Sequence, residues 1–312
     1  MRICNLILSV IIPTKNRCYL LENLLFTITQ QTLEVSLFEV IIIDNGSTDK
    51  TKEIVKNYEK KIHSLNYFYD STPGLHVGRH LGLKHAAGEI LVYLDDDVEL
   101  FPEHLESVLR IFEVPEVVLV GGKNLPKFEL NPPFWLENMW KEKKIIAQLS
   151  IIDLGKDIHE INPNFVWGCN FSIRKSILIE AGGFHPDAMP EELIHFRGDG
   201  ESCITQYIDA KNYKALYHPA VSVYHFVPNS RMSEEYFCKR MYQQGISDSY
   251  TILRKYAKFS DLEARRAKKL TNATLLDEKM YNAYLDGYIY HQQECKHNVK
   301  LMEWVLKDRY YD

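Results

Sequence analysis

Hydrophobic residues along the first 120 positions alternate between short continuous runs and runs with helical spacing. The continuous runs at 7–12, 38–43, 67–69, 90–94 and 117–120 predict buried strands. Helical spacing predicts helices between them, at about 20–28, 48–60, 76–87 and 102–112. Alternation of this kind predicts an α/β fold with a doubly wound, mostly parallel sheet.

The second half of the chain has a less regular pattern. Residues 123–164 look irregular and rich in aromatic residues, which favours a hydrophobic flap over the sheet rather than a substrate-facing loop. A strand is expected at 165–173, a helix from 198 to 210, and one or two strands at 214–227. From Ser233 the pattern is helical. One long final helix is expected to carry a stripe that is typical of core or dimer contact, formed by Tyr281, Tyr284, Leu285, Tyr288, Gln292, Cys295, Val299 and Met302.

Polar residues follow three of the predicted strands: Pro13 and Thr14, then Asp44, then the consecutive aspartates 95–97. Ligands of doubly wound sheets bind at the carboxyl ends of the strands, so one polar crevice is expected there. Oxygen-only ligands suit Mg²⁺ or Mn²⁺ bridged to the phosphates of a nucleotide. The alternative is a solvated acidic turn before the helix near Pro102. No GxGxxG follows the first strand, which argues against a dinucleotide-binding fold.

Bulk properties exclude some classes of protein. The formal net charge of the 312 residues is −5, which argues against a nucleic-acid binder. The six cysteines are scattered, without a CxxC pair and without clustering near histidine, so reduced thiols are expected rather than disulfides or a zinc site. No apolar run reaches the roughly 18 residues that span a membrane.

These properties indicate a cytoplasmic protein, and we interpret the apolar N-terminus as a first strand rather than a signal peptide. Peripheral contact with the inner face of a membrane stays open, because a basic cluster of Arg265, Arg266, Lys268 and Lys269 could meet anionic lipid. A solvated helix face is the alternative interpretation of this cluster. The tyrosine-rich C-terminal helices also leave a homodimer open.

The strand ends, in their order along the chain, resemble the family 2 glycosyltransferases, which are inverting enzymes with the GT-A fold. The resemblance runs from about residue 8 to 250, and eight motifs in register carry it. These motifs are 9–17, 39–49, 74–75 with Arg79, 88–97, 167–174, 182–184, 198–201 and 224–231. The resemblance implies a mixed, mostly parallel sheet. It also implies a glycosyltransferase domain at 1–230, with a nucleotide-binding half at about 1–122 and an acceptor half at about 123–230, and a helical extension at 231–312.

The resemblance also implies roles for donor-side residues. Pro13, Thr14 and Asp44 match the pocket of the nucleotide base, where Asp44 accepts a hydrogen bond from the base. The outer positions of the family's Asp-x-Asp motif hold the ribose and a divalent cation, Mn²⁺ or Mg²⁺, under the diphosphate. The remaining assignments are Arg79, Asp95 and Asp96 to donor binding, and Asp97 and His225 to the metal.

On the acceptor side, Asp199 matches the second acidic residue of the family's Glu-Asp pair, the general base. The first position of that pair is Gly198 here, so Glu201 competes with Asp199 for the role. Trp167 is a candidate platform for an acceptor sugar. Simpler structural roles stay open: Asp199 could cap a helix, His225 could be a packed histidine, and Trp167 could be core.

The expected function is therefore metal-dependent, inverting transfer of one sugar from a nucleotide-sugar donor, with a UDP-sugar favoured. The expected acceptor is a saccharide or a lipid-linked hydroxyl, in surface polysaccharide or glycan biosynthesis. The absence of a Gln-x-x-Arg-Trp motif from the printed sequence favours addition of a single sugar. Two alternatives stay open: a nucleotidyltransferase on a similar sheet, and a catalytically silent nucleotide-binding assembly partner.

Overall fold

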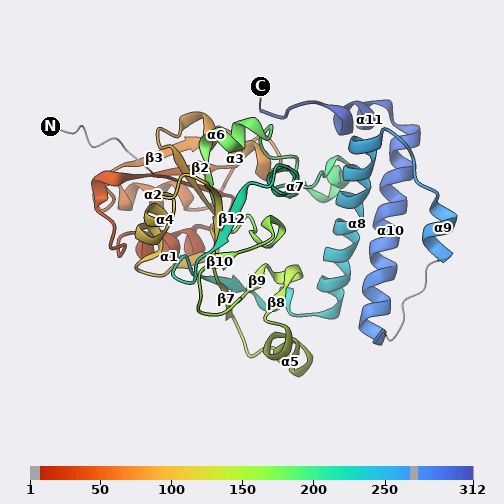
Figure 1. Cartoon of the computed structure of the whole chain (residues 1–312), viewed down its shortest axis with the longest axis horizontal. Helices are drawn as coiled ribbons and strands as arrows, with labels where there is room; N and C mark the ends of the chain where they lie inside the picture. The colour runs from red at the N-terminus through yellow and green to blue at the C-terminus, as the bar shows by residue number, and fades with distance from the viewer. Residues whose placement is uncertain (1–7, 268–272, 312) are drawn as a thin grey trace.

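The computed structural model describes residues 8–267 and 273–311 (Figure 1). Its centre is an eight-stranded sheet with the order β10-β12-β6-β11-β4-β1-β2-β3. The strands are β1 (Leu8–Thr14), β2 (Phe38–Asp44), β3 (Leu65–Tyr69), β4 (Ile90–Leu94), β6 (Val117–Gly121), β10 (His159–Glu160), β11 (Asn170–Arg174) and β12 (Lys214–Tyr217). β11 runs antiparallel to both of its neighbours, and β10 is antiparallel to β12; the other pairs are parallel. The predicted mixed, mostly parallel sheet is confirmed.

Helices cover both faces of this sheet because alternate strand residues point to opposite sides. Along β1, Val10 and Ile12 belong to one hydrophobic core and Ile11 to another. The first core contains residues of α1 (Cys18–Ile28), α2 (Thr51–Tyr58) and α4 (His104–Ile111). The second contains residues of α3 (Leu75–His85), α6 (Lys175–Glu180) and α7 (Ser202–Ala210). This arrangement is the predicted doubly wound one.

A second, five-stranded sheet was not predicted. It has the order β5-β13-β7-β9-β8 and consists of β5 (Val98–Leu100), β7 (Asn124–Phe128), β8 (Ile145–Ile146), β9 (Ile151–Ile152) and β13 (Val223–Val227). The helix α5 (Phe134–Lys143) lies between β7 and β8 in sequence. The expectation that residues 123–164 are irregular was therefore wrong. Two of the strands are only two residues long, too short to give an alternating pattern.

The stretch 214–227 forms two strands, which was one of the two predicted possibilities, and they lie in different sheets. Two predicted boundaries differ from the structure. The strand expected from 165 begins at Asn170, after a short 3₁₀ helix at Pro163–Phe165. The helix expected from 198 begins at Ser202, because Gly200 takes a left-handed φ of 59° that a continuing helix does not allow. Further 3₁₀ helices lie at Val35–Leu37, Ala147–Leu149, Glu191–Phe196 and Asn229–Arg231.

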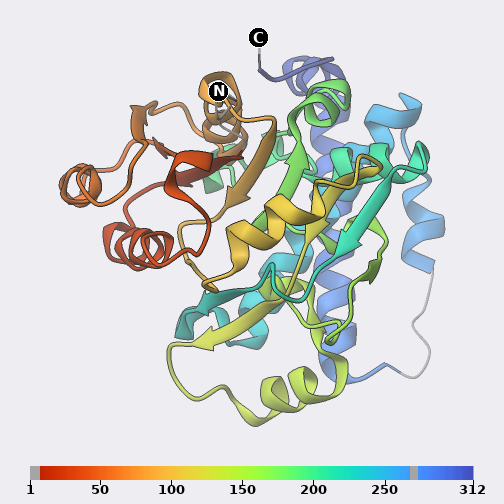
Figure 2. The same cartoon turned by 60° about the vertical axis from the view of Figure 1, so that its left-hand side comes forward.

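The C-terminal part is helical, as predicted, with α8 (Glu234–Tyr256), α9 (Leu262–Ala267), α10 (Leu275–His297) and α11 (Val299–Leu306). α8 and α10 lie side by side in both views (Figures 1 and 2). The single final helix was wrong, because the chain breaks at Asn298, whose side chain accepts a hydrogen bond from the amide of Leu301 and caps α11. Four residues of the predicted stripe, Leu285, Tyr288, Gln292 and Cys295, are buried, whereas Val299 is exposed.

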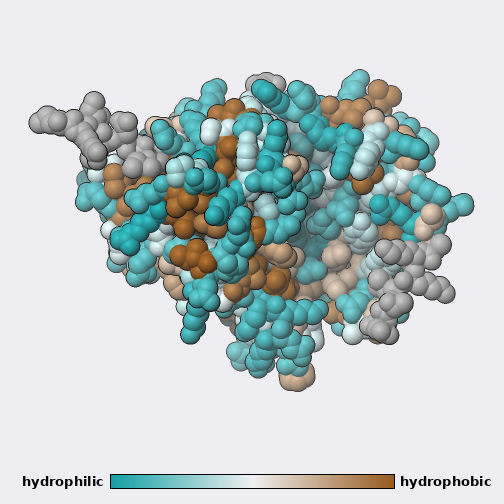
Figure 3. Space-filling model, in the orientation of Figure 1, coloured by the Kyte–Doolittle hydropathy of each residue, from teal (hydrophilic) through white to brown (hydrophobic). Residues whose placement is uncertain are grey.

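Two features of the predicted surface can be compared with the structure. In the basic cluster, the Arg265 guanidinium lies 3.9 Å from the ring centre of Tyr288, while Lys268 and Lys269 lie outside the described residues. Within the described part of the chain, every helix is either too short or too polar to cross a bilayer. The face seen in Figure 3 is mostly hydrophilic and is hollowed between the sheet-containing part and the long helices.

Two glycines allow α8 and α10 to approach closely. A Cβ added at Gly245 of α8 would lie 2.0 Å from the carbonyl oxygen of Tyr284, and one added at Gly287 of α10 would lie 1.9 Å from that of Tyr242. Both distances are far below van der Waals contact, and both obstacles are backbone atoms that cannot rotate away. Replacing either glycine must therefore move one helix.

We expect Gly245→Ala and Gly287→Ala each to lower the free energy of unfolding by about 2 kcal/mol or more, as overpacked sites do. Urea unfolding followed by circular dichroism measures the change. Asn282→Ala, at an exposed position of α10, is the matched control and should be close to neutral. Equal stability of the glycine variants and this control would contradict the close packing.

Buried neutral histidines make stability depend on pH. Burial lowers the pKa of both His104 and His291 to about 4. The unfolded chain takes up these protons near pH 6.5, before the folded protein does. Stability is therefore complete above about pH 6.5 and is lost as pH falls towards 4.

We expect wild-type protein to be less stable at about pH 5 than at about pH 7, with each of these two histidines contributing about 2 kcal/mol to the loss. His291→Gln should show a loss smaller by that amount, since glutamine does not titrate. Urea unfolding at the two pH values measures this difference. An identical pH dependence in the variant would rule out the role of His291.

Candidate active site

A cavity of about 680 Å³ opens at the carboxyl ends of β1 and β4, where the polar crevice was expected. Its lining also includes residues from α3, from the loop that precedes α7, and from the first half of α8. Eight of the residues singled out in the sequence line it together: Pro13, Thr14, Arg79, Asp95, Asp96, Asp97, Glu201 and His225.

The consecutive aspartates are held by donors from distant parts of the chain. Asp96 is 4% exposed and accepts hydrogen bonds from the Thr14 hydroxyl at 2.7 Å and from Arg17 at 2.9 Å. Asp97 is 5% exposed and lies 3.2 Å from Arg17 and 3.4 Å from Arg231. These contacts exclude the solvated acidic turn that was the alternative interpretation.

The second sheet brings His225 to Asp97. β5 follows Asp97 directly and pairs antiparallel with β13, so that His225 stands opposite Val98. The amide of Phe226 donates a 2.8 Å hydrogen bond to the carbonyl oxygen of Asp97. This bond fixes the corner of the cavity where Asp97 and His225 meet. His225 Nε2 then lies 3.3 Å from Asp97 Oδ1.

The neighbouring cations favour the ionised form of Asp97 more than that of Asp96. Burial alone would raise the pKa of Asp97, but the neighbouring His225, Arg231 and Arg17 outweigh burial and hold this pKa well below its usual range. Burial raises the pKa of Asp96 to about 6, against the opposing effect of Arg17 and with added repulsion from Asp97. Asp97 is therefore the firmly ionised member of the pair and the better ligand for a cation.

The residues present fit a divalent cation at this corner. Asp97 Oδ1 is buried and without a hydrogen-bond partner among the described residues, and the imidazole nitrogen that faces it is His225 Nε2. The contact between Asp97 Oδ1 and His225 Nε2 is close, but its geometry is not that of a hydrogen bond. A carboxylate oxygen and an imidazole nitrogen that face the same cavity are suitable ligands for Mn²⁺ or Mg²⁺.

Arg79 connects the aspartates to the other side of the cavity. Its guanidinium lies 3.6 Å from Asp95 and 3.3 Å from Glu201, and it stacks 4.9 Å from the ring centre of Phe184. Burial alone would lower the pKa of Arg79, but the two carboxylates outweigh burial and raise it. A Cβ at Gly168 would lie 2.1 Å from this guanidinium, so only glycine leaves room for Arg79.

Asp44 lies outside this cavity and lines a smaller neighbouring one of about 340 Å³. One of its carboxylate oxygens accepts a 2.7 Å hydrogen bond from Tyr67, and the other accepts a 2.6 Å bond from the amide of Ser47. Each carboxylate oxygen can accept a second hydrogen bond, so Asp44 keeps acceptor capacity in this cavity.

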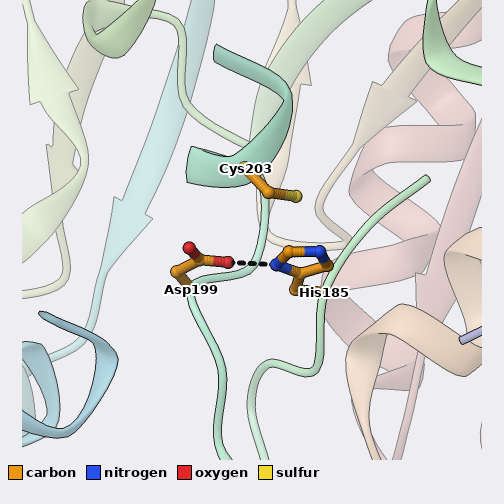
Figure 4. Close-up of side chains that lie close together, drawn as sticks. All are labelled: His185, Asp199 and Cys203. Carbon is orange, nitrogen blue, oxygen red and sulfur yellow. Dashed lines mark hydrogen bonds and ion pairs between the residues drawn. The ribbon is translucent and has the colours of Figure 1, made fainter. Parts of the chain in front are cut away.

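Asp199 also lies outside the lining of the large cavity. One oxygen pairs with His185 Nδ1 at 2.6 Å (Figure 4), and the other accepts a 2.7 Å hydrogen bond from Thr251 of α8. Asp199 does not cap α7, which begins three residues later at Ser202. Glu201, by contrast, lines the large cavity and accepts a 3.1 Å hydrogen bond from the amide of Gly168.

One cysteine lies near a histidine in the fold, although the two are far apart in the sequence. Cys203, His185 and Asp199 place their ligand atoms within 4.8 Å of one another (Figure 4). However, the Cys203 thiol donates to the carbonyl oxygens of Gly183 and Gly200, and burial raises its pKa, which favours the thiol over the thiolate that binds metals. We interpret this cluster as a hydrogen-bonded support. The five cysteines within the described residues are free thiols.

Trp167 does not line either cavity. Its indole nitrogen donates a 3.1 Å hydrogen bond to the carbonyl oxygen of Asn164, and the ring packs against the first hydrophobic core. Its neighbours Gly168 and Cys169 line the large cavity instead.

Sequence reasoning missed several charged residues of the cavity. Arg17 and Arg231 lie within two quoted motifs but were given no role, and the buried pair Asp187–Arg197, 2.7 Å apart, was not singled out. The first half of α8 was assigned to an extension, yet it contributes lining residues. These are Tyr236, Lys239, Arg240 and Gln243.

Comparison with known proteins decides the family. The model of the family described as "Glycosyl transferase family 2" matches residues 9–182, more than half of the chain. The chain belongs to glycosyl transferase family 2. The strand-end motifs in register are thus those of a glycosyltransferase family, as the resemblance implied.

Relatives support this membership over shorter stretches. The validoxylamine A glucosyltransferase of Streptomyces hygroscopicus is 38% identical over 111 residues, which cover 35% of this chain and 26% of the relative. The GalNAc(5)-diNAcBac-PP-undecaprenol beta-1,3-glucosyltransferase of Campylobacter jejuni is 36% identical over 105 residues, or 33% of each protein. The chain thus matches about a quarter to a third of the length of these relatives.

A solved structure shows the same fold over nearly the whole chain. The mannosyltransferase PcManGT from Pyrobaculum calidifontis, in complex with GDP-Man and Mn²⁺, has a TM-score of 0.57 at 18% identity. The similarity covers 93% of this chain and 75% of the mannosyltransferase. The GT-A fold that the sequence led us to expect is thereby confirmed.

We expect Asp97→Asn to weaken Mn²⁺ binding about tenfold or more, because the firmly ionised ligand becomes neutral; tenfold corresponds to about 1.4 kcal/mol. Free Mn²⁺ can be measured by electron paramagnetic resonance during a titration. Asp286→Asn, an exposed carboxylate on α10, is the matched control. Unchanged Mn²⁺ affinity in Asp97→Asn would place the cation elsewhere.

Proposed function

We propose that the protein is a metal-dependent inverting glycosyltransferase that moves one sugar from a nucleotide-sugar donor to an acceptor hydroxyl. One observation carries the proposal: Asp97 and His225, a suitable ligand pair for a cation, lie side by side in the wall of the cavity that Arg79 and Glu201 also line. Membership of the glycosyltransferase family supports this assignment.

On the donor side, Asp97 and His225 would hold Mn²⁺ or Mg²⁺, which acts as a Lewis acid on the leaving diphosphate. Arg17 and Arg231 both contact the carboxylate of Asp97. They would therefore lie close to the phosphates of the donor. Pro13 and Thr14, at the end of β1, line the large cavity. Asp44 and Tyr67 offer hydrogen-bonding groups for the base in the smaller cavity.

On the acceptor side, a carboxylate must take the proton of the attacking hydroxyl. Glu201 is the candidate that the geometry favours, because it lines the cavity and lies across Arg79 from Asp95. Asp199 is only two residues away and, like Glu201, has both oxygens bonded within the protein, but Asp199 does not line the cavity. We infer that Asp199 positions the loop that carries Glu201, while direct base action by Asp199 stays the alternative.

A UDP-sugar remains our predicted donor, although the mannosyltransferase of the same fold carries GDP-Man, so the base has to be tested. We propose a saccharide or lipid-linked acceptor, and surface polysaccharide or glycan biosynthesis as the context. The name of the Campylobacter relative, which contains a diphosphate-linked undecaprenol acceptor, supports the lipid-linked alternative. Addition of a single sugar, peripheral membrane contact and a homodimer stay predictions.

The first experiment is calorimetric titration of UDP, GDP and dTDP, each with Mn²⁺ and with EDTA. We expect one nucleotide to bind, and its affinity to fall about tenfold or more with EDTA or in Asp97→Asn. Asp286→Asn is again the control. Binding of none of the three would contradict the donor pocket.

The second experiment separates the two candidate bases. With the matching sugar nucleotide, Glu201→Gln should lower kcat by about 10²- to 10⁴-fold while nucleotide affinity stays within a few-fold, since a base acts in the chemical step. Asp199→Asn should keep more activity and lower stability, because its hydrogen bonds to His185 and Thr251 support a loop. The reverse order of activity loss would make Asp199 the base.

The same assay tests the two other functions. A glycosyltransferase releases the nucleoside diphosphate, whereas a nucleotidyltransferase releases pyrophosphate. Nucleotide binding without any turnover would favour the silent assembly partner.

A further inference from the structure

The cations in the wall of the large cavity are mostly paired with carboxylates. Arg17 and Arg231 contact Asp97, and Arg79 lies between Asp95 and Glu201. The two remaining pairs are Arg197 with Asp187 and Lys239 with Glu191. These pairs leave little net positive charge at the positions where they form.

Two cations in the cavity wall differ from these, because no ion pair is found for them among the described residues. The first is Lys15, an exposed residue directly after β1. The second is Arg240 of α8. It lines the cavity and is only half-buried, and among residues 8–267 and 273–311 no carboxylate lies within 4 Å of its guanidinium. Its recorded hydrogen bond is to the neutral side-chain oxygen of Gln243, at 3.2 Å. A guanidinium that faces solvent-filled space with unused donors is suited to bind an anion.

The carboxylate near Arg240 is Asp187, which already has another cation as its partner. Asp187 lies 2.7 Å from Arg197, which also donates to the hydroxyl of Ser247. Burial is the main cause that lowers the pKa of Arg197, and the positive charge of Arg240 adds to it. Arg197 is the main charge that lowers the pKa of Asp187, with smaller contributions from Arg79 and Arg240. The neighbourhood of Arg240 therefore has an excess of positive charge.

Arg240 belongs to the acceptor side of the cavity. Within 4 Å of Asp97 lie His225, Arg231 and Arg17. Arg240 instead belongs to α8, whose Ser247 accepts a hydrogen bond from Arg197, and Arg197 lies in the segment between α6 and α7 that also carries Glu201. The diphosphate of a donor would lie at the Asp97 corner, where Arg17 and Arg231 already supply positive charge. An anion bound at Arg240 would then be part of the second substrate.

We propose that Arg240 binds an anionic group of the acceptor, a phosphate or a carboxylate carried by the molecule whose hydroxyl receives the sugar. This inference rests on the proposed function and narrows its substrate class. Guanidinium groups bind both kinds of anion through two parallel hydrogen bonds, and Gln243 would hold the guanidinium in place. The source of the anion is either a lipid-linked diphosphate or an acidic sugar.

The test uses the full-length protein saturated with Mn²⁺ and with the nucleoside diphosphate that binds it. Geranyl diphosphate, glucuronic acid and the neutral methyl glucoside are then titrated by calorimetry, while ultrafiltration confirms that the nucleotide stays bound. We expect at least one of the two anions to bind more tightly than methyl glucoside. Arg240→Gln should weaken that anion about tenfold or more, with partial recovery in Arg240→Lys.

Lys255→Gln removes one charge from the exposed far end of α8 and is the matched control, with affinities like those of the wild type. Loss of geranyl diphosphate binding alone in Arg240→Gln identifies a lipid-linked acceptor, and loss of glucuronic acid binding alone identifies an acidic sugar. Three outcomes would overturn the proposal: neither anion binds, Arg240→Gln weakens neither, or Arg240→Gln weakens the nucleotide instead. Failure of the proposed function is seen separately, because then either no nucleotide would bind or the sugar nucleotide would not release its nucleoside diphosphate.

Discussion

The repulsion among three consecutive carboxylates at the end of β4 is the constraint on which the site depends. Asp96 and Asp97 are almost fully buried, and two buried negative charges side by side are costly unless cations face them. Arg17 comes from the start of α1 and Arg231 from the segment before α8, about 130 residues after the aspartates. The fold therefore has to bring Arg17 and Arg231, which lie far apart in the sequence, to one strand end.

The second sheet brings the later of these residues, Arg231, to the end of β4. Because β5 follows Asp97 and pairs with β13, the chain places His225 beside the aspartates and delivers Arg231 a few residues later. α8 then starts at the rim of the cavity and contributes lining residues. We therefore interpret α8 as part of the catalytic unit, although the sequence pattern assigned it to an extension beyond residue 230.

The central sheet and the aspartate cluster could be predicted from sequence because their signals are local. β1, β2 and β4 are mostly apolar runs, and a polar residue stands at the end of each: Thr14, Asp44 and Asp95. The second sheet could not be predicted, since β8 and β9 have two residues each and β13 shows its role only through its partner β5. The pairing of Arg79 with Glu201, 122 positions apart, depends on tertiary structure and leaves no pattern in the sequence.

The placement of Asp199 shows why a motif match needs geometry beside it. Gly200, with its left-handed φ, turns the chain between Asp199 and Glu201, so the two carboxylates face different surroundings. Asp199 joins His185 to Thr251 of α8, whereas Glu201 faces Arg79 in the cavity. A side chain other than glycine at position 200 would be strained there, and it would also lie 3.0 Å from Asp187. The same short turn thus directs one carboxylate to support the loop and the other to the wall of the large cavity.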